Sequence, residues 1–129
     1  MINLNGTLIS KQESIYQNRA LHYADALFET IRVQHNKILF WEAHYFRLMA
    51  GMRILRMEIP MHFTPEFLEK QIFNTLNAQP KYLANTPQAF RIKILVYRQW
   101  GGFYLPANAQ VHYIIEAQPL KNLTYTYTT

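Results

Sequence analysis

The sequence predicts a single α+β domain in which a mixed or antiparallel β-sheet carries two helices, in the order ββββ-αα-ββ. Three observations lead to this prediction. Alternating apolar and polar residues occur toward both ends of the chain, and two segments with helical periodicity lie between them. The 129 residues, 50% hydrophobic and 16% charged, suffice for one core but not comfortably for two.

The first half of the sheet is predicted to consist of two hairpins. Asn5-Gly6 suits a tight two-residue turn between short strands within residues 2–9. A polar loop over 11–18 precedes a strand over 26–33, which turns at 35–37 and returns over 38–41. The 26–33 strand has a mostly apolar face, predicted to meet the core, and a second face made of Phe28, Thr30 and Arg32.

Two helices are predicted next. The helix over 42–57 has one apolar stripe, formed by Trp41, Tyr45, Leu48, Met52 and Leu55. Arg47 and Gly51 share another stripe, and because a mid-helix glycine costs about 1 kcal/mol relative to alanine, another group is expected close to it. The second helix begins at Thr64-Pro65-Glu66, with a cap, a first-turn proline and an acidic residue. Its buried face is predicted to contain Leu68, Ile72 and Leu76.

The last two strands follow a loop over 77–87. The strand over 89–100 ends at Gly101-Gly102, and its two faces differ. One face carries Phe90, Ile92, Ile94, Val96 and Arg98, and the other carries Arg91, Lys93, Leu95 and Tyr97. A final strand over 110–118 precedes Pro119. Residues 1–119 are therefore predicted to form the domain, and 120–129 to be a linker or the start of another unit.

Composition excludes several kinds of site. Without cysteine there are no disulfides, thiol nucleophiles or cysteine zinc sites, which fits a cytoplasmic protein. The first residues show no signal peptide, and no apolar run approaches the ~18 residues of a membrane span. The five histidines lack metal-ligand spacing, so no metal site is predicted. The net charge of +5 fits anionic partners as well as a merely soluble cationic surface.

Four arginines lie among apolar residues of predicted strands and a helix, namely Arg32, Arg47, Arg91 and Arg98. Arginine keeps its charge and is rarely buried unless it is paired. One interpretation is a pocket for anions. The other is a set of ion pairs and snorkelling side chains at the edges of the sheet. Residue type alone does not decide between them.

The segment from Asn18 to Val33 resembles the class IV aminotransferases, the group with pyridoxal-phosphate fold type IV. Those proteins carry a pattern like R-G-x-x-Y-G-D-G-x-F-E-T-I-R and, on a later helix, H-x-x-R-L. Here the first pattern ends in Phe28-Glu29-Thr30-Ile31-Arg32, and the second is His44-x-x-Arg47-Leu48. The resemblance covers most of the chain and implies the smaller N-terminal domain of the D-amino acid aminotransferase-like fold.

The resemblance also implies roles for individual residues. Arg47 matches the arginine that holds the phosphate of pyridoxal 5′-phosphate, a role suited to a bidentate guanidinium. Tyr23 matches an active-site tyrosine near the substrate carboxylate and the cofactor, although an ordinary half-buried tyrosine fits equally well. Arg91 and Arg98 match substrate-carboxylate arginines of different subfamilies. Arg32 belongs to the motif and is expected to contact either the substrate or a structural carboxylate.

The chain departs from the family pattern in two respects. Alanines stand where the family has glycines around Tyr23, namely Ala20, Ala24 and Ala26. The family's cofactor-binding lysine lies in the larger C-terminal domain, whereas the last lysine here, Lys121, lies in the predicted linker. No catalytic residue is therefore assigned, and the 129 residues alone are predicted to lack transaminase or lyase activity.

Three hypotheses about function follow. The first is the N-terminal part of an enzyme that moves an amino group between an amino acid and a 2-oxo acid, or of an aminodeoxychorismate lyase, working as a homodimer. The second is a non-catalytic module that binds anions or self-associates through exposed aromatic residues. The third and weakest is a sheet that binds nucleic acid through the Arg, Lys and Tyr side chains of residues 89–100.

Overall fold

The computed structural model describes residues 1–10, 25–82, 88–98 and 111–121. The elements in chain order are β1 (Ile2–Leu4), β2 (Thr7–Ile9), β3 (Asp25–Gln34), β4 (Lys37–Ile38), α2 (Trp41–Ile54), α3 (Pro65–Asn77), β5 (Ala89–Arg98) and β6 (Val111–Leu120). The six strands form one sheet in the order β2-β1-β6-β5-β3-β4, and every pairing is antiparallel. This confirms the predicted α+β class and element order.

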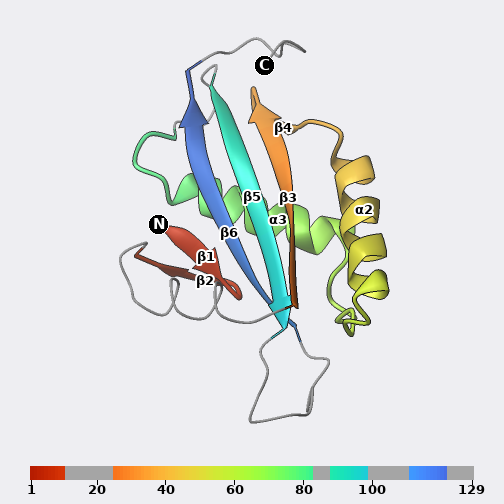
Figure 1. Cartoon of the computed structure of the whole chain (residues 1–129). Coiled ribbons are helices and arrows are strands. Elements are labelled where there is room, and N and C mark those ends of the chain that lie inside the picture. Colours follow the sequence, from red (N-terminus) through yellow and green to blue (C-terminus); the bar gives the residue numbers. More distant parts are fainter. Residues whose placement is uncertain (11–24, 83–87, 99–110, 122–129) are drawn as a thin grey trace.

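Both helices cover the same face of the sheet; among the described residues no helix covers the other face, which is called the open face below (Figure 1). Helix α2 packs against β3, and α3 crosses behind the sheet against β6 and β1. The main core lies between helices and sheet and includes Ile31, Leu48, Met52, Leu68, Ile72 and Ile94. A small second cluster of Ile2, Tyr97 and Ile114 lies on the open face. The predicted apolar faces of both helices and of β3 are therefore confirmed.

Two short turns shape the hairpins. Asn5 and Gly6 have φ of 52° and 90°, and His35 and Asn36 have φ of 53° and 63°. Positive φ at both central residues gives the turn type that matches strand twist. The predicted return strand over 38–41 is wrong in length, because β4 ends at Ile38 and the left-handed Phe40, φ 56°, caps α2 instead.

Helix α2 ends earlier than predicted, at Ile54 rather than Met57. Arg56 adopts a left-handed φ of 57° and donates its backbone N–H to Arg53 at 3.0 Å, while Met57 donates to Met52 at 2.8 Å. This pair of bonds is a Schellman motif, and Met52 and Met57, at the positions that usually carry apolar residues in this motif, are both buried in the main core. Glycine is the ordinary residue at the left-handed position, so its absence concealed this helix end.

The remaining boundaries follow the prediction more closely. The Thr64 side chain accepts a hydrogen bond from the Phe67 backbone N–H at 3.1 Å, and Pro65 opens α3, as predicted. Strand β6 extends beyond the predicted 118 to Leu120, with Pro119 opposite Phe90. Among the described residues, β1 pairs with β6 only at Ile114 and Ile115, so this end of β6 forms a sheet edge where proline is tolerated.

Gly51 lies on the side of α2 that faces β3. A Cβ built on Gly51 would lie 2.6 Å from Cδ1 of Leu27, so the predicted neighbour is the Leu27 side chain. This close approach holds the middle of α2, and with it Arg47 one turn earlier, near the strand.

We expect Gly51→Ala to stabilise the chain only when Leu27 is shortened. Alanine gains about 1 kcal/mol of helix propensity, but the methyl group must displace Leu27. In a Leu27→Ala background Gly51→Ala is expected to raise the free energy of unfolding by the full helix-propensity gain. In the parent chain the cost of displacing Leu27 is expected to cancel that gain. Urea unfolding of the two single variants and the double variant measures this coupling. Equal stabilisation in both backgrounds would show that Leu27 does not restrict the helix.

Candidate functional site

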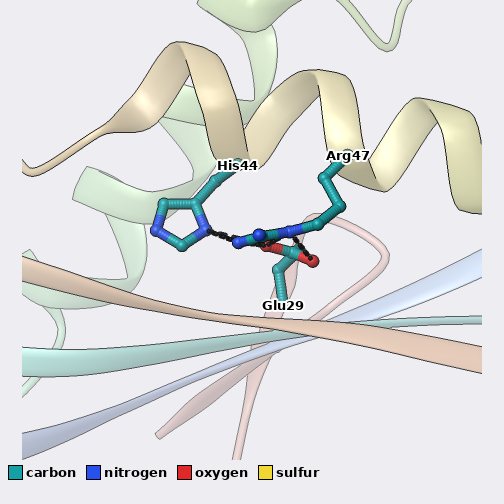
Figure 2. Close-up of polar contacts among 3 residues, drawn as sticks. All are labelled: Glu29, His44 and Arg47. Atoms are coloured by element: carbon teal, nitrogen blue, oxygen red, sulfur yellow. Dashed lines mark hydrogen bonds and ion pairs between the residues drawn. The ribbon is translucent and has the colours of Figure 1, made fainter.

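A polar cluster joins α2 to β3 beside the core (Figure 2). Glu29 projects from the helix-covered face of β3, and His44 and Arg47, on successive turns of α2, reach down to it. Arg47 donates from Nε to Oε1 and Oε2 at 3.1 and 3.0 Å, and from Nη2 to Oε1 at 3.0 Å. The helical spacing of three places both α2 side chains over one carboxylate.

His44 completes the cluster. Its Nδ1 lies 2.7 Å from Glu29 Oε1 and 3.2 Å from Arg47 Nη2. Because an ionised carboxylate only accepts and a guanidinium only donates, Nδ1 carries a proton when it bonds Glu29 and then cannot accept from Arg47. The short contact to Glu29 therefore assigns the proton to Nδ1.

The cluster is buried at the strand and open at the helix. The side chain of Glu29 is 11% exposed, whereas that of Arg47 is 65% exposed. Burial raises the pKa of Glu29, but the hydrogen bonds and charges of Arg47 and His44 outweigh burial and leave that pKa below its ordinary value. The same hydrogen bond raises the pKa of Arg47. Glu29 therefore remains ionised at neutral pH.

Arg47 retains the donors that an anion needs. All its contacts to other described residues use Nε and Nη2. One N–H of Nη1 and the second N–H of Nη2 form the end edge of the guanidinium, which suits bidentate binding of a phosphate. The donor set and its exposure thus fit the predicted phosphate group.

Two other predicted site residues meet on the open face of the sheet. Arg32 and Arg91 are directly opposite in the β3–β5 register, although facing like charges destabilise a sheet. Arg32 donates to Oε1 of Gln34 at 2.8 Å, and Arg91 donates to Oε1 of Gln118. Lys93, two residues further, lies 5.1 Å from the centre of the Phe28 ring. This face thus brings several cationic side chains together.

Adjacent hollows connect these arginines to the α2 cluster. One hollow of about 330 Å³ is lined by Arg32, Arg91, His44 and Phe40, among others. A second of about 330 Å³ shares Thr30 and Arg91 with it and continues over Lys93 and Glu116. His44 therefore borders both the Arg47 cluster and the space between Arg32 and Arg91.

Arg98 lies apart from the other arginines. It is only 9% exposed and projects from the helix-covered face of β5. Its Nη1 and Nη2 donate to the backbone carbonyls of Arg56 and Leu55 at 3.1 and 3.2 Å. These carbonyls end α2 and have no partner within the helix. The contacts of Arg98 therefore cap a helix from the core side.

The predictions about Tyr23, metal sites and membrane spans are considered next. Tyr23 and the rest of the 18–24 segment lie outside the described residues. Where the chain is described, no three His, Cys, Asp or Glu side chains gather as metal ligands. None of the helices in the described segments has the length and apolar character required to span a membrane.

A larger hollow, of about 810 Å³, lies between α3, the β1–β2 turn and β6. Its floor includes Phe63, Phe67 and Tyr113, whose rings pack edge to face or stack. Burial raises the pKa of Tyr113 to about 12, so its hydroxyl stays protonated. None of the predicted site residues in the described segments lines this hollow.

Sequence reasoning missed Glu29 and His44 as members of the site. It treats Glu29 only as part of the motif, and His44 only as the start of the helix pattern or as one of several scattered histidines. A signal was present, because Glu29 is the one charged residue on the apolar face of the predicted 26–33 strand and therefore requires a cation nearby. His44 and Arg47, three residues apart on the next helix, were the available candidates.

A comparison with protein-family models finds amino-transferase class IV over residues 26–129. A comparison with curated proteins finds no significant match.

Solved structures with the same fold include several branched-chain amino acid aminotransferases. The Escherichia coli enzyme is 22% identical with a TM-score of 0.71, covering 92% of this chain and 40% of its own. A T.th. enzyme with pyridoxamine 5′-phosphate is 25% identical with a TM-score of 0.69, covering 93% and 40%. The Thermoproteus uzoniensis enzyme with norvaline is 22% identical with a TM-score of 0.68, covering 92% and 40%. The chain thus spans about two fifths of the length of these proteins.

Proposed function

Because this chain belongs to the class IV aminotransferase family, we propose that it supplies the phosphate-binding arginine and part of the substrate pocket of a pyridoxal-phosphate enzyme. The enzyme transfers an amino group between an amino acid and a 2-oxo acid. Bound cofactor supplies the electron sink for this chemistry, and the residues of this chain bind and orient. One observation carries the proposal: His44, which is bonded to the same Glu29 carboxylate that holds Arg47, also lines the hollow that contains Arg32 and Arg91.

Arg47 is proposed to bind the cofactor phosphate. The Arg47 side chain is exposed, its guanidinium is bonded to Glu29 along one edge, and Arg47 is the arginine of the H-x-x-R-L pattern on α2. A phosphate accepts two parallel N–H bonds from the end edge while Glu29 retains the other edge. The cluster therefore fixes the phosphate end of the cofactor against α2.

Arg32 and Arg91 are proposed to bind the substrate carboxylate. The two residues are opposite each other in the strand register, so their side chains lie on the same face, and a carboxylate provides two acceptor oxygens that can accept from both guanidinium groups. We favour Arg91 over Arg98 for this role because Arg98 is buried on the opposite face and its donors cap α2. Tyr23 remains a proposed member of the substrate pocket on the basis of the motif alone.

The experiment that tests the cofactor role compares two ligands that differ only in phosphate. One charge-assisted contact contributes about 1.5–3 kcal/mol, whereas a Kd of 1 mM requires about 4.1 kcal/mol. Binding to the 129-residue chain is thus expected to be weaker than 1 mM and suits NMR titration. Pyridoxamine 5′-phosphate is expected to shift Arg47 signals and pyridoxamine is not. Equal responses to both ligands would contradict the proposal.

The overall reaction requires a separate test. The product of the complete reading frame, loaded with pyridoxal 5′-phosphate, is expected to transfer amino groups from amino acids to 2-oxo acids. Branched-chain amino acids are the first substrates to assay because the similar solved structures carry that name. Pyruvate release from aminodeoxychorismate, without amino transfer, would instead indicate the lyase branch.

We also propose that the protein is a cytoplasmic homodimer. The absence of cysteine supports the location. Phe46 and Ile54, 58% and 79% exposed on the outward side of α2, support self-association, because large apolar side chains on one helix face favour contact with another surface. Sedimentation over a range of concentrations tests the dimer, and a monomer at every concentration would contradict it.

A further inference from the structure

Arg47 is unusually well held for an exposed arginine. A long side chain with 65% exposure ordinarily samples many rotamers, and ordering such a chain costs binding free energy. Here the Nε edge lies against a carboxylate that is only 11% exposed and belongs to β3, a strand that pairs along its length with β5. The direction of the guanidinium plane is therefore set before any ligand arrives.

The donors that Arg47 uses to bind Glu29 decide which edge of its guanidinium is left for a ligand. Glu29 uses Nε–H and one N–H of Nη2, so the end edge formed by Nη1 and Nη2 faces away from the carboxylate. If Glu29 instead occupied the end edge, only the narrower side would remain for a ligand. His44 restrains the carboxylate in turn, because its Nδ1 lies 2.7 Å from the same Oε1 that receives Nη2.

We propose that Glu29, restrained by His44, is a positioning residue that orients the end edge of Arg47 toward the phosphate. This inference rests on the proposed phosphate role of Arg47 and adds two residues that act through it. Neither Glu29 nor His44 contacts the phosphate in this arrangement.

Glu29 also exerts an opposing effect, because its negative charge repels a phosphate. The two effects differ in their response to salt. Repulsion between partly exposed charges is screened when the Debye length falls from about 10 Å at 0.1 M to about 3 Å at 1 M. Orientation through direct hydrogen bonds from Arg47 to the carboxylate is far less affected. Because salt screens the attraction between Arg47 and the phosphate equally in the parent chain and in a Glu29 variant, a difference between them that persists at 1 M salt reports the positioning role.

The test uses the 129-residue chain, with pyridoxamine 5′-phosphate as probe and pyridoxamine as its phosphate-free control. In Glu29→Ala at 1 M NaCl, the preference for the phosphorylated ligand is expected to fall about three- to tenfold. The Nε–H NMR signal of Arg47 is expected to lose its hydrogen-bonded shift and to exchange faster with water. Glu29→Gln keeps one acceptor oxygen, so its preference for the phosphorylated ligand is expected to lie between that of Glu29→Ala and that of the parent chain.

Matched variants separate positioning from general effects of charge and folding. Glu42→Gln removes one exposed negative charge from the first turn of α2 without touching Arg47, and is expected to change neither readout. His44→Ala is expected to weaken the preference, and His44→Asn to restore it, because the asparagine amide can place a donor near the position of Nδ1. A purely structural histidine would not be rescued in this way.

The outcomes separate the two proposals. If Arg47→Met leaves the phosphate preference intact, the proposed function of Arg47 fails, and this inference fails with it. If Arg47→Met abolishes the preference but a folded Glu29→Ala or Glu29→Gln variant keeps it at 1 M NaCl, only the positioning role is overturned.

Discussion

Replacing Arg47 by methionine is expected to abolish the preference of the chain for pyridoxamine 5′-phosphate over pyridoxamine. Methionine keeps an apolar stem along α2 but removes every donor. Losing a charge-assisted contact of about 1.5–3 kcal/mol corresponds to roughly a 10- to 150-fold loss of affinity for the phosphorylated ligand. NMR titration of both ligands, at constant ionic strength, measures the loss.

Two controls accompany the Arg47 variant. Arg53→Met removes another exposed arginine of the same helix, outside the Glu29 cluster, and is expected to leave the ligand preference unchanged. Arg47→Lys keeps the charge but loses the planar fork, so an intermediate loss is expected. Full binding by Arg47→Lys would indicate that net charge, and not the fork, attracts the phosphate.

Replacing Arg98 by alanine is expected to lower the free energy of unfolding by about 3 kcal/mol. The side chain is 9% exposed, so truncation leaves a cavity in the core. The truncation also removes the two hydrogen bonds that Arg98 donates to the backbone carbonyls of Leu55 and Arg56. These carbonyls lie at the end of α2, where Arg56 has a left-handed backbone conformation. Urea or guanidinium denaturation measures the change.

The matched control for Arg98 is Arg91→Ala on the same strand. Arg91 is exposed on the other face, and its loss is expected to cost less than about 1 kcal/mol. Arg98→Met nearly preserves the side-chain volume and loses only the donors. Its loss in free energy of unfolding is therefore expected to lie between those of Arg98→Ala and Arg91→Ala. Equal stability of the Arg98→Ala and Arg91→Ala variants would show that the contacts at the end of α2 contribute little.

Local patterns were sufficient for most of the fold. Alternation along β3 and β5 assigned their faces, and Thr64 with Pro65 located the start of α3, because a strand's period and a helix cap are properties of a few neighbouring residues. Errors arose where an unusual residue took a left-handed conformation. Phe40 and Arg56 both do so, and neither residue type signals it.

The features of the candidate site also separate into those that local sequence shows and those that depend on the folded chain. The family motif, the chemistry of the arginines and the strand faces on which Arg91 and Arg98 lie can all be read from the amino-acid sequence. Three relations became visible in the folded chain: Arg32 and Arg91 are opposite in the strand register, Arg98 caps α2, and Glu29 with His44 holds Arg47. These relations join residues far apart in the chain, and their partners depend on strand order and helix docking, which no short-range periodicity encodes.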